Sequence, residues 1–232
     1  MPVIYIDLDG TLLDVWPRYY TCMSSFFESQ SLPFVTFQQY KRQKRELVRD
    51  DVIIRRLIRN NPAAAEELIS KYKLWKKDKL ESESLLKLDQ PIGQLRFFAA
   101  QLKPNYQLYL ISVRSKHEPA VRQLQRLNMV APFKRINLVS PSSCINPKWQ
   151  IIRHLATPAD LLIGDSETDL ECGFMLGLRT FHVDTGLRSY EYANRYANCY
   201  ANRNSSRNAS RSASCQNKAV PLRQYNDVLS YL

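Results

Sequence analysis

Six polar side chains in this 232-residue chain either follow a short apolar run or open the helix that comes after one. They are Asp7, Asp9, Ser112, Lys148, Asp165 and Asp169. In an open α/β sheet, ligands bind at the carboxyl ends of the strands. We therefore expect these side chains to meet in one crevice, although they are far apart in the sequence.

Two of the carboxylates lie two residues apart in the segment Asp7-Leu8-Asp9-Gly10-Thr11. In an irregular loop both can face the same pocket. Together with Asp165 they would form an oxygen-rich cluster, which suits Mg²⁺ because that ion prefers oxygen ligands and keeps several waters. Three clustered carboxylates repel one another unless a cation lies among them. A divalent ion and Lys148 would supply that positive charge.

The chemistry that fits this cluster is phosphoryl transfer. A carboxylate can attack phosphorus and give an aspartyl-phosphate, which divides one difficult step into two. A metal ion and a lysine such as Lys148 can neutralise the phosphoryl oxygens during that step. Lys116, Lys134 and Arg153 compete with Lys148 for this role at the level of sequence.

Four further positions are candidates for phosphate binding. The hydroxyl of Ser112 can donate to a phosphoryl oxygen, and the turn at Gly10 and Thr11 can offer free backbone N–H groups. Arg114 lies two residues after Ser112, at the expected mouth of the crevice. Arg114 either contacts substrate or lies on the surface. The same two alternatives apply to Arg18, in the loop that enters the helical region.

The elements that must position these residues alternate between strand and helix. Apolar runs predict strands at residues 2–8, 107–111, 135–139, 160–163 and 179–183. Helical patterns fall between the later strands, at residues 91–102, 117–127, 147–155 and 168–176. This order predicts a Rossmann-like α/β core with a parallel sheet and helices on both faces.

An α-helical region interrupts the alternation after the first strand. From residue 15 to residue 89, apolar side chains recur at helical spacing among many charged residues, with Asn61-Pro62 between two such stretches. We expect this region to form an inserted helical cap domain. The α/β core then comprises residues 1–14 and 90–187.

The last part of the chain changes in composition. Residues 188–217 begin with a Tyr-Ala-Asn repeat of period four and then become rich in Ser, Asn and Arg. This segment has too few large apolar residues to build a core, so we expect it to be disordered, although the repeat itself could continue as a helix. Residues 218–232 carry enough apolar side chains to dock on the core.

These motifs resemble those of haloacid dehalogenase-like (HAD) superfamily phosphatases, including phosphoglycolate-phosphatase-like members with a helical cap. The resemblance covers most of residues 1–187. It rests on four motifs in order: the segment from Asp7 to Asp14, the hydrophobic run that ends at Ser112, then Lys148, and Gly164-Asp165-Ser166-Glu167-Thr168-Asp169. The first and last motifs are the most specific.

The resemblance implies a role for each matching residue. Asp7 would be the nucleophile and a magnesium ligand, and Asp9 the general acid and base, with its backbone carbonyl on the metal. Lys148 would balance the charge of the nucleophile. Asp165 would bind magnesium, and Asp169 would support the metal or orient Lys148. The second aspartate of the motif is absent from the family's dehalogenases, so Asp9 favours phosphoryl chemistry.

Bulk composition narrows the possible partners and the location. The net charge of +11 suggests an anionic partner, such as a small phosphorylated substrate.

No run approaches the roughly 18 apolar residues that span a bilayer, and no signal peptide is apparent, so we expect a cytoplasmic protein without membrane contact. The five cysteines have no CxxC spacing and fit reduced thiols. Nothing in the sequence predicts an oligomeric state.

Three functions remain open at this stage. The first is a magnesium-dependent phosphatase that acts on a small phosphate monoester. The second is a phosphomutase or nucleotidase with the same chemistry. The third is a non-catalytic regulatory or RNA-binding protein, which would use the basic residues of the cap, such as those at 41–45, and the Arg/Ser tail. The basic cap residues also fit a solvated surface with no partner.

Overall fold

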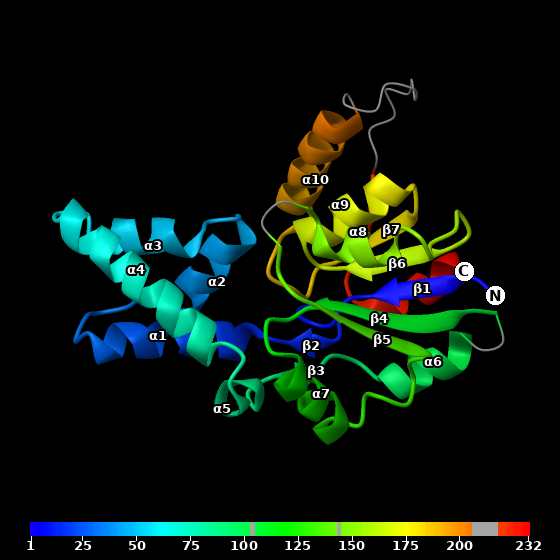
Figure 1. Cartoon of the computed structure of the whole chain (residues 1–232), viewed down its shortest axis with the longest axis horizontal. Helices are drawn as coiled ribbons and strands as arrows, with labels where there is room; N and C mark the ends of the chain where they lie inside the picture. Colours follow the sequence, from blue (N-terminus) through cyan, green and yellow to red (C-terminus); the bar gives the residue numbers. More distant parts are fainter. Residues whose placement is uncertain (103–104, 143–144, 206–217) are drawn as a thin grey trace.

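The computed structural model describes residues 1–102, 105–142, 145–205 and 218–232. Its main feature is a six-stranded sheet in which every pair of neighbouring strands is parallel, in the order β5-β4-β1-β6-β7-β8 (Figure 1). The strands are β1 (Val3–Ile6), β4 (Gln107–Val113), β5 (Arg135–Val139), β6 (Leu161–Gly164), β7 (Arg179–Val183) and β8 (Val220–Leu222). The Rossmann-like α/β core is therefore confirmed.

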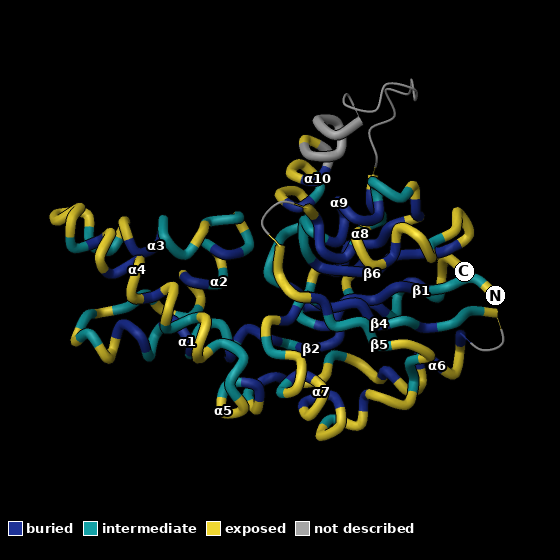
Figure 2. Tube along the Cα trace, viewed as in Figure 1, coloured by how far each residue is buried: buried dark blue, intermediate teal, exposed yellow. Residues whose placement is uncertain are grey.

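Strand β1 lies inside the sheet and is buried on both faces (Figure 2). Ile4 and Ile6 pack into one hydrophobic cluster and Tyr5 into another, because successive side chains of a strand point to opposite faces. A strand that is buried on both faces has a continuous run of apolar residues, so the sequence alone is enough to locate it.

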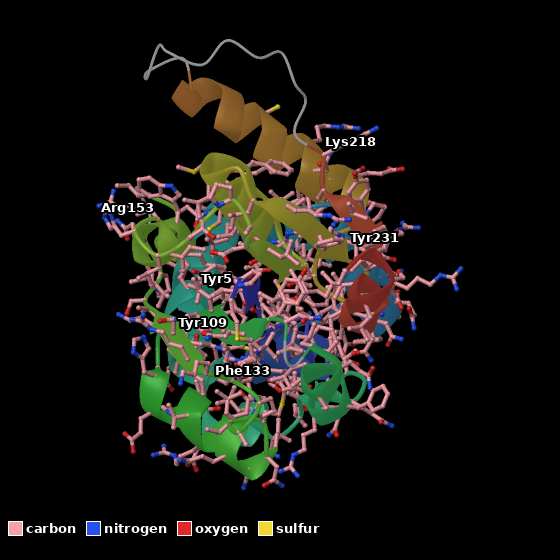
Figure 3. The ribbon with its side chains drawn as sticks, turned by 90° about the vertical axis from the view of Figure 1, so that its right-hand side faces the viewer. Tyr5, Tyr109, Phe133, Arg153, Lys218 and Tyr231 are labelled. Carbon is pink, nitrogen blue, oxygen red and sulfur yellow. The ribbon has the colours of Figure 1, made fainter. Side chains whose placement is uncertain are left out.

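Helices cover both faces of the sheet (Figure 1). One face packs against α6 (Leu95–Leu102), α7 (His117–Arg126) and the 3₁₀ helix η1 (Tyr225–Tyr231). The other packs against α8 (Pro147–Ile152) and α9 (Glu167–Leu176). Figure 3 shows Tyr5 and Tyr109 in the interior beside the sheet, where their rings meet edge to face.

Five helices lie between β1 and α6 in the sequence, and the first four of them extend away from the sheet (Figure 1). They are α1 (Trp16–Ser29), α2 (Phe37–Arg45), α3 (Asp50–Leu57), α4 (Pro62–Lys79) and α5 (Glu83–Leu86). Residues of α1 to α4 share their own hydrophobic cluster. Thr36 caps α2 through a capping box with Gln39, and the Asn61 side chain caps α4 just before Pro62.

Ion pairs neutralise part of the basic surface of these inserted helices. Lys44 and Lys76 both contact Asp50, at 2.8 and 2.6 Å, and Arg55 contacts Asp51 and Glu66. None of the helices in the described part of the chain is long and apolar enough to cross a membrane.

A small antiparallel pair of strands joins the two ends of the insertion. Strand β2 (Leu13–Asp14) pairs with β3 (Gln90–Pro91), so the chain leaves and re-enters the core at one place. The helix predicted at residues 91–102 therefore begins later, at Leu95. Pro91 belongs to β3, and Gly93 has a positive φ of 63°, which interrupts any helix before that point.

Two features at the C-terminal end differ from the sequence expectations. Residues Tyr190–Ser205 form a helix, α10, which buries Ala193 and Ala197 against Leu170 of α9, so this part of the segment expected to be disordered is helical. The small side chains of the repeat allow this close helix packing. Residues 206–217 lie outside the described residues.

The second difference is that the main sheet has six strands rather than five. Val220–Leu222 pairs with β7 as β8, and η1 follows it, with Tyr225 and Val228 buried in the core. A run of three residues that contains Pro221 carries little strand signal in the sequence. In Figure 3 this segment, between Lys218 and Tyr231, lies along one side of the core.

Candidate active site

A pocket of about 260 Å³ opens at the carboxyl ends of β1, β4 and β6. The core contributes most of its lining, and Tyr19 of α1 contributes from the insertion. The predicted site residues that line it are Asp7, Asp9, Ser112, Lys148 and Asp165. The sheet thus brings these side chains to one pocket, as the strand-end positions predict.

Lys148 links two buried carboxylates at the base of this pocket. Its Nζ lies 2.7 Å from Oδ1 of Asp7, and it also contacts Oδ1 of Asp169. Asn146 positions the lysine, because its Oδ1 accepts from the backbone N–H groups of Lys148 and Trp149 and so caps α8. The competing Lys116 instead contacts the backbone carbonyl of Asp78, 2.7 Å away.

Asp165 lies beside these residues and is held by two other segments. The N–H of Leu187 donates to its Oδ2 at 2.8 Å, and the Thr11 hydroxyl lies 3.4 Å from its Oδ1. A Cβ on Gly10 would overlap the Asp165 carboxylate, and Gly10 has a φ of 79°. Only glycine fits this turn, since it combines a left-handed backbone with a close approach to the acid.

Burial and mutual repulsion shift the protonation of the acidic cluster. Burial raises the pKa of Asp7 to about 7; the charge of Lys148 opposes this rise, and the nearby Asp169 adds to it. Burial also raises the pKa of Asp165 well above its usual range, with Asp7 and Asp169 adding to the effect. Burial lowers the pKa of Lys148, but Asp169 and Asp7 outweigh it and leave this pKa raised.

The cluster has the composition of a divalent metal site. Asp7, Asp165 and Asp169 each offer a carboxylate oxygen, and these oxygens lie within 4.8 Å of one another. A set of buried carboxylate oxygens fits Mg²⁺, and the positive charge of the ion would relieve their repulsion. The sequence placed the Asp9 carboxylate in one cluster with Asp7 and Asp165, whereas this carboxylate contacts Arg18 and Arg114. The metal contact predicted for the Asp9 backbone carbonyl stays a prediction.

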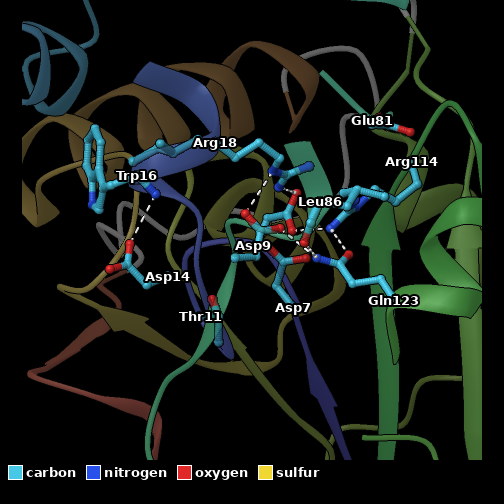
Figure 4. Close-up of polar contacts among 12 residues, drawn as sticks. Asp7, Asp9, Thr11, Asp14, Trp16, Arg18, Glu81, Leu86, Arg114 and Gln123 are labelled. Atoms are coloured by element: carbon cyan, nitrogen blue, oxygen red, sulfur yellow. Dashed lines mark hydrogen bonds and ion pairs between the residues drawn. The ribbon is translucent and has the colours of Figure 1, made fainter. Parts of the chain in front are cut away.

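Two arginines hold the carboxylate of Asp9, one on each oxygen (Figure 4). Nη2 of Arg18 lies 2.7 Å from Oδ2, and Arg114 contacts Oδ1. Both guanidinium groups are fully buried. Burial raises the pKa of Asp9, but Arg114 and Arg18 outweigh it and hold this pKa below its usual range.

Asp89 and Gln123 complete the surroundings of these arginines. Arg18 Nε lies 3.1 Å from Asp89, and the Gln123 amide donates to Asp89 at 2.7 Å. Gln123 also accepts from Arg114, at 3.3 Å. Sequence reasoning missed both residues, because a single acid at a domain boundary and a glutamine in a helix carry no signal of their own.

The Arg114 guanidinium and the Gly10 N–H, both predicted to bind phosphate, have partners within the protein. Arg114 is buried behind Asp9 and does not line the pocket, since Asp9 engages its guanidinium. The N–H of Gly10 donates to the carbonyl of Leu13 at 2.9 Å, because the turn uses this group internally. The Thr11 hydroxyl is fully buried and lies 3.4 Å from Asp165, and the predicted phosphate contact of the Thr11 backbone N–H stays a prediction. Ser112 lines the pocket as expected.

No protein-family model and no curated protein sequence matches this chain. Solved structures do match it. A predicted phosphatase from Clostridium acetobutylicum has a TM-score of 0.63 and 14% identity, with 99% of this chain and 97% of that chain covered. The HAD-hydrolase YfnB from Bacillus subtilis, bound to magnesium, has a TM-score of 0.56 and 18% identity, with 99% and 97% covered. The chain has the haloacid dehalogenase-like fold.

The HAD-like fold agrees with the resemblance seen in the motifs, and several other matching structures are described as HAD hydrolases. Protein Tyrosine Kinase A of Mycobacterium tuberculosis also matches, with a TM-score of 0.64, 14% identity, and 99% of this chain and 97% of that chain covered. Proteins with this fold are thus described under different activities. The reaction has to be argued from the side chains in the pocket.

Proposed function

We propose that this protein is a magnesium-dependent phosphatase that hydrolyses a small phosphate monoester through an aspartyl-phosphate on Asp7. One observation carries the proposal: the Asp7 carboxylate lies in the pocket, 2.7 Å from the Lys148 ammonium and within the cluster formed with Asp165 and Asp169. This arrangement joins a nucleophile, a cation that neutralises charge and a set of metal ligands.

In the first step, a carboxylate oxygen of Asp7 attacks phosphorus while the bond from phosphorus to the leaving oxygen breaks. Lys148 holds the attacking group and balances negative charge that builds up around it. Ser112 lines the same pocket and can donate its hydroxyl proton to a phosphoryl oxygen. A magnesium ion held by Asp7, Asp165 and Asp169 would neutralise the phosphoryl oxygens.

Asp9 is the group that moves protons in this proposal. To give a proton to the leaving oxygen in the first step, Asp9 first takes one up from solvent, because Arg114 and Arg18 favour its ionised form in the free protein. In the second step Asp9 takes a proton from the water that attacks the aspartyl-phosphate, which returns Asp7 as a carboxylate and releases inorganic phosphate. Arg18 and Arg114 favour the ionised form of Asp9, which suits its role as a base in the second step.

The first test uses an aryl phosphate, whose leaving group needs little help from an acid. We expect the purified protein to hydrolyse p-nitrophenyl phosphate with Mg²⁺ and to lose this activity in excess EDTA. Asp7→Asn should lower kcat by at least about 10³-fold, because an amide is a poor nucleophile. Asp78→Asn, at an exposed position outside the pocket, is the matched control. Full activity of pure Asp7→Asn would exclude this mechanism.

A panel of phosphorylated metabolites, nucleotides and sugar bisphosphates then distinguishes the alternatives. We expect the highest kcat/KM for a small monoester. Preference for nucleoside monophosphates would favour a nucleotidase, and turnover that requires a bisphosphorylated sugar would favour a phosphomutase. A salt-sensitive shift of an RNA with no turnover of any phosphate would favour the non-catalytic alternative.

A further inference from the structure

The loop of residues 184–189, between β7 and α10, lies against the acidic cluster. The N–H of Leu187 donates to Oδ2 of Asp165 at 2.8 Å, and a Cβ on Gly186 would overlap the same carboxylate. Leu187 also lines the active-site pocket. The backbone of this loop therefore covers one side of Asp165 and engages one of its two carboxylate oxygens.

The inserted helices hold the same loop through several hydrogen bonds. At the C-terminal end of α2, the Arg45 side chain donates to the carbonyl of Asp184 at 2.9 Å, and the N–H of Ser189 donates to the carbonyl of Arg45 at 3.1 Å. Nη1 of Arg188 donates to the carbonyl of Lys44 at 3.2 Å. At the start of α1, Trp16 Nε1 donates to the carbonyl of Thr185 at 3.2 Å.

These contacts fit the electrostatics of a helix end. The last carbonyls of a helix lack intrahelical partners and carry partial negative charge. The N–H of Ser189 satisfies one such carbonyl of α2, that of Arg45. Arg188 is an additional donor to the Lys44 carbonyl, which also accepts from the N–H of Leu47 at 3.1 Å. Arg45 adds an ion pair with Asp184, and Arg188 adds one with Glu167 of α9, 2.9 Å away. Arg188 thus bridges the insertion and the core directly.

We infer that Arg45 and Arg188 are positioning residues for the metal site, which they affect by holding loop 184–189 against Asp165. The affinity for Mg²⁺ then depends on the inserted helices being docked on this loop. The inference rests on the metal site in the proposed function. Its physical basis is that the Leu187 N–H fixes one oxygen of Asp165 and leaves the other directed at the cluster. Mutating a group that holds a metal ligand in place typically weakens metal affinity by about 10- to 100-fold.

The test is Mg²⁺ binding to the full-length protein without substrate, measured by titration calorimetry. We expect Arg188→Met and the double variant Arg45→Met/Arg188→Met to bind Mg²⁺ about 10- to 100-fold more weakly than the wild type. With saturating Mg²⁺, kcat should stay within about two-fold of wild type, since these arginines do not line the pocket. Arg188→Lys should recover part of the affinity.

Arg42→Met is the matched control. Arg42 lies on the same helix as Arg45, is exposed, and its side chain makes no ion pair or hydrogen bond among the described residues. Its Mg²⁺ affinity should equal that of the wild type. Unchanged affinity in the folded double variant, with folding checked by thermal melting, would overturn the inference. A wild type that binds no Mg²⁺ would instead overturn the metal site itself.

A second measurement needs no variant. Coupling between two sites is reciprocal, so Mg²⁺ should in turn stabilise the contact between α2 and the loop. The amide of Ser189, which donates to Arg45, should exchange its hydrogen several-fold more slowly with saturating Mg²⁺ than without it. Exchange at this amide that does not respond to Mg²⁺, in a protein that binds the ion, would contradict the coupling.

Discussion

Asp7 and Asp9 are two residues apart in the sequence, yet their carboxylates meet different partners. Asp7 contacts Lys148 and lies in the acidic cluster, whereas two arginines hold Asp9. In an extended strand residues i and i+2 would share a face, so this separation depends on the irregular backbone that follows β1, which ends at Ile6. The burial and charges around each acid shift the two pKa values in opposite directions. These different surroundings suit the two proposed roles: Asp7 as a nucleophile that also binds the metal, and Asp9 as the group that transfers protons.

Lys148→Met tests the charge balance around Asp7, the proposed nucleophile. Without the ammonium, Asp7 and Asp169 lose their shared buried counter-ion, so we expect kcat for an aryl phosphate at saturating Mg²⁺ to fall by about 10²-fold or more. Lys148→Arg keeps the charge and should retain more activity. Equal activity of Lys148→Met and the wild type in a steady-state assay would remove this lysine from the mechanism.

Glu171 of α9 gives a prediction about stability and pH. Burial raises its pKa from 4.5 to about 7; the Asn146 amide opposes this rise, and Glu167 adds to it. The folded state keeps a proton that the unfolded state releases between about pH 4.5 and 7. The free energy of unfolding contributed by this group is therefore highest at acidic pH and falls as the pH rises through that window.

Glu171→Gln should remove this dependence. We expect the free energy of unfolding to increase by about 1 kcal/mol at pH 8 and to change little at pH 4, after allowance for solvent screening near the protein surface. Urea unfolding of both proteins at the two pH values measures the difference. A variant that is less stable than the wild type at pH 8 would mean that Glu171 is ionised and stabilising in the folded state.

At the level of single elements, α8 shows how a short helix serves the site. It has only six residues, and the Asn146 side chain fixes its start. The Oδ1 of Asn146 accepts from two backbone N–H groups, and its Nδ2 donates to the carbonyl of Thr168 at 2.7 Å. This one side chain therefore ties the helix that carries Lys148 to the segment that carries Asp169.

Asn146→Ala should affect both stability and activity. Loss of the cap and of the bond to Thr168 should lower the free energy of unfolding by about 1–2 kcal/mol. Lys148 would also be less well fixed, so we expect kcat to fall by about ten-fold. Chemical denaturation and steady-state kinetics measure the two effects. Asn146→Ser, which keeps a capping oxygen, should lie between the alanine variant and the wild type.

At the level of the whole molecule, Arg18 connects the insertion to the core. It comes from α1, contacts Asp9 in the core, and contacts Asp89 where the chain returns from the insertion. Every group in this set is buried or nearly so. Removing one partner of a buried ion pair leaves uncompensated charge, which is much more costly than losing a surface contact.

Arg18→Met should therefore destabilise the protein by about 3 kcal/mol, as measured by the midpoint and slope of urea unfolding. The double variant Arg18→Met/Asp89→Asn should regain part of this stability, because Asp89 then no longer carries a buried charge that has lost its arginine partner. Arg56→Met, at an exposed position of α3, serves as the control and should change stability by less than about 0.5 kcal/mol. Full stability of Arg18→Met would show that the ion pairs contribute nothing to this connection.

The sequence by itself determined the order of strands and helices in the core and the polar residues that follow each strand. Buried parallel strands read as apolar runs, and the strand ends must share one edge of the sheet. For this reason Asp7, Ser112, Lys148 and Asp165 could be assigned to one crevice before their positions were known. The α/β core and the HAD-like fold that the motifs predicted are confirmed.

The tertiary structure decided which charges face each other. The contacts of Asp9 with Arg18 and Arg114, and of Asp89 with Arg18, join segments whose side-chain directions no local pattern encodes. The same holds for loop 184–189, whose residues carry no motif and yet lie between α2 and Asp165. Local periodicity records which face of an element is buried, whereas the pairing of charges depends on how distant elements pack.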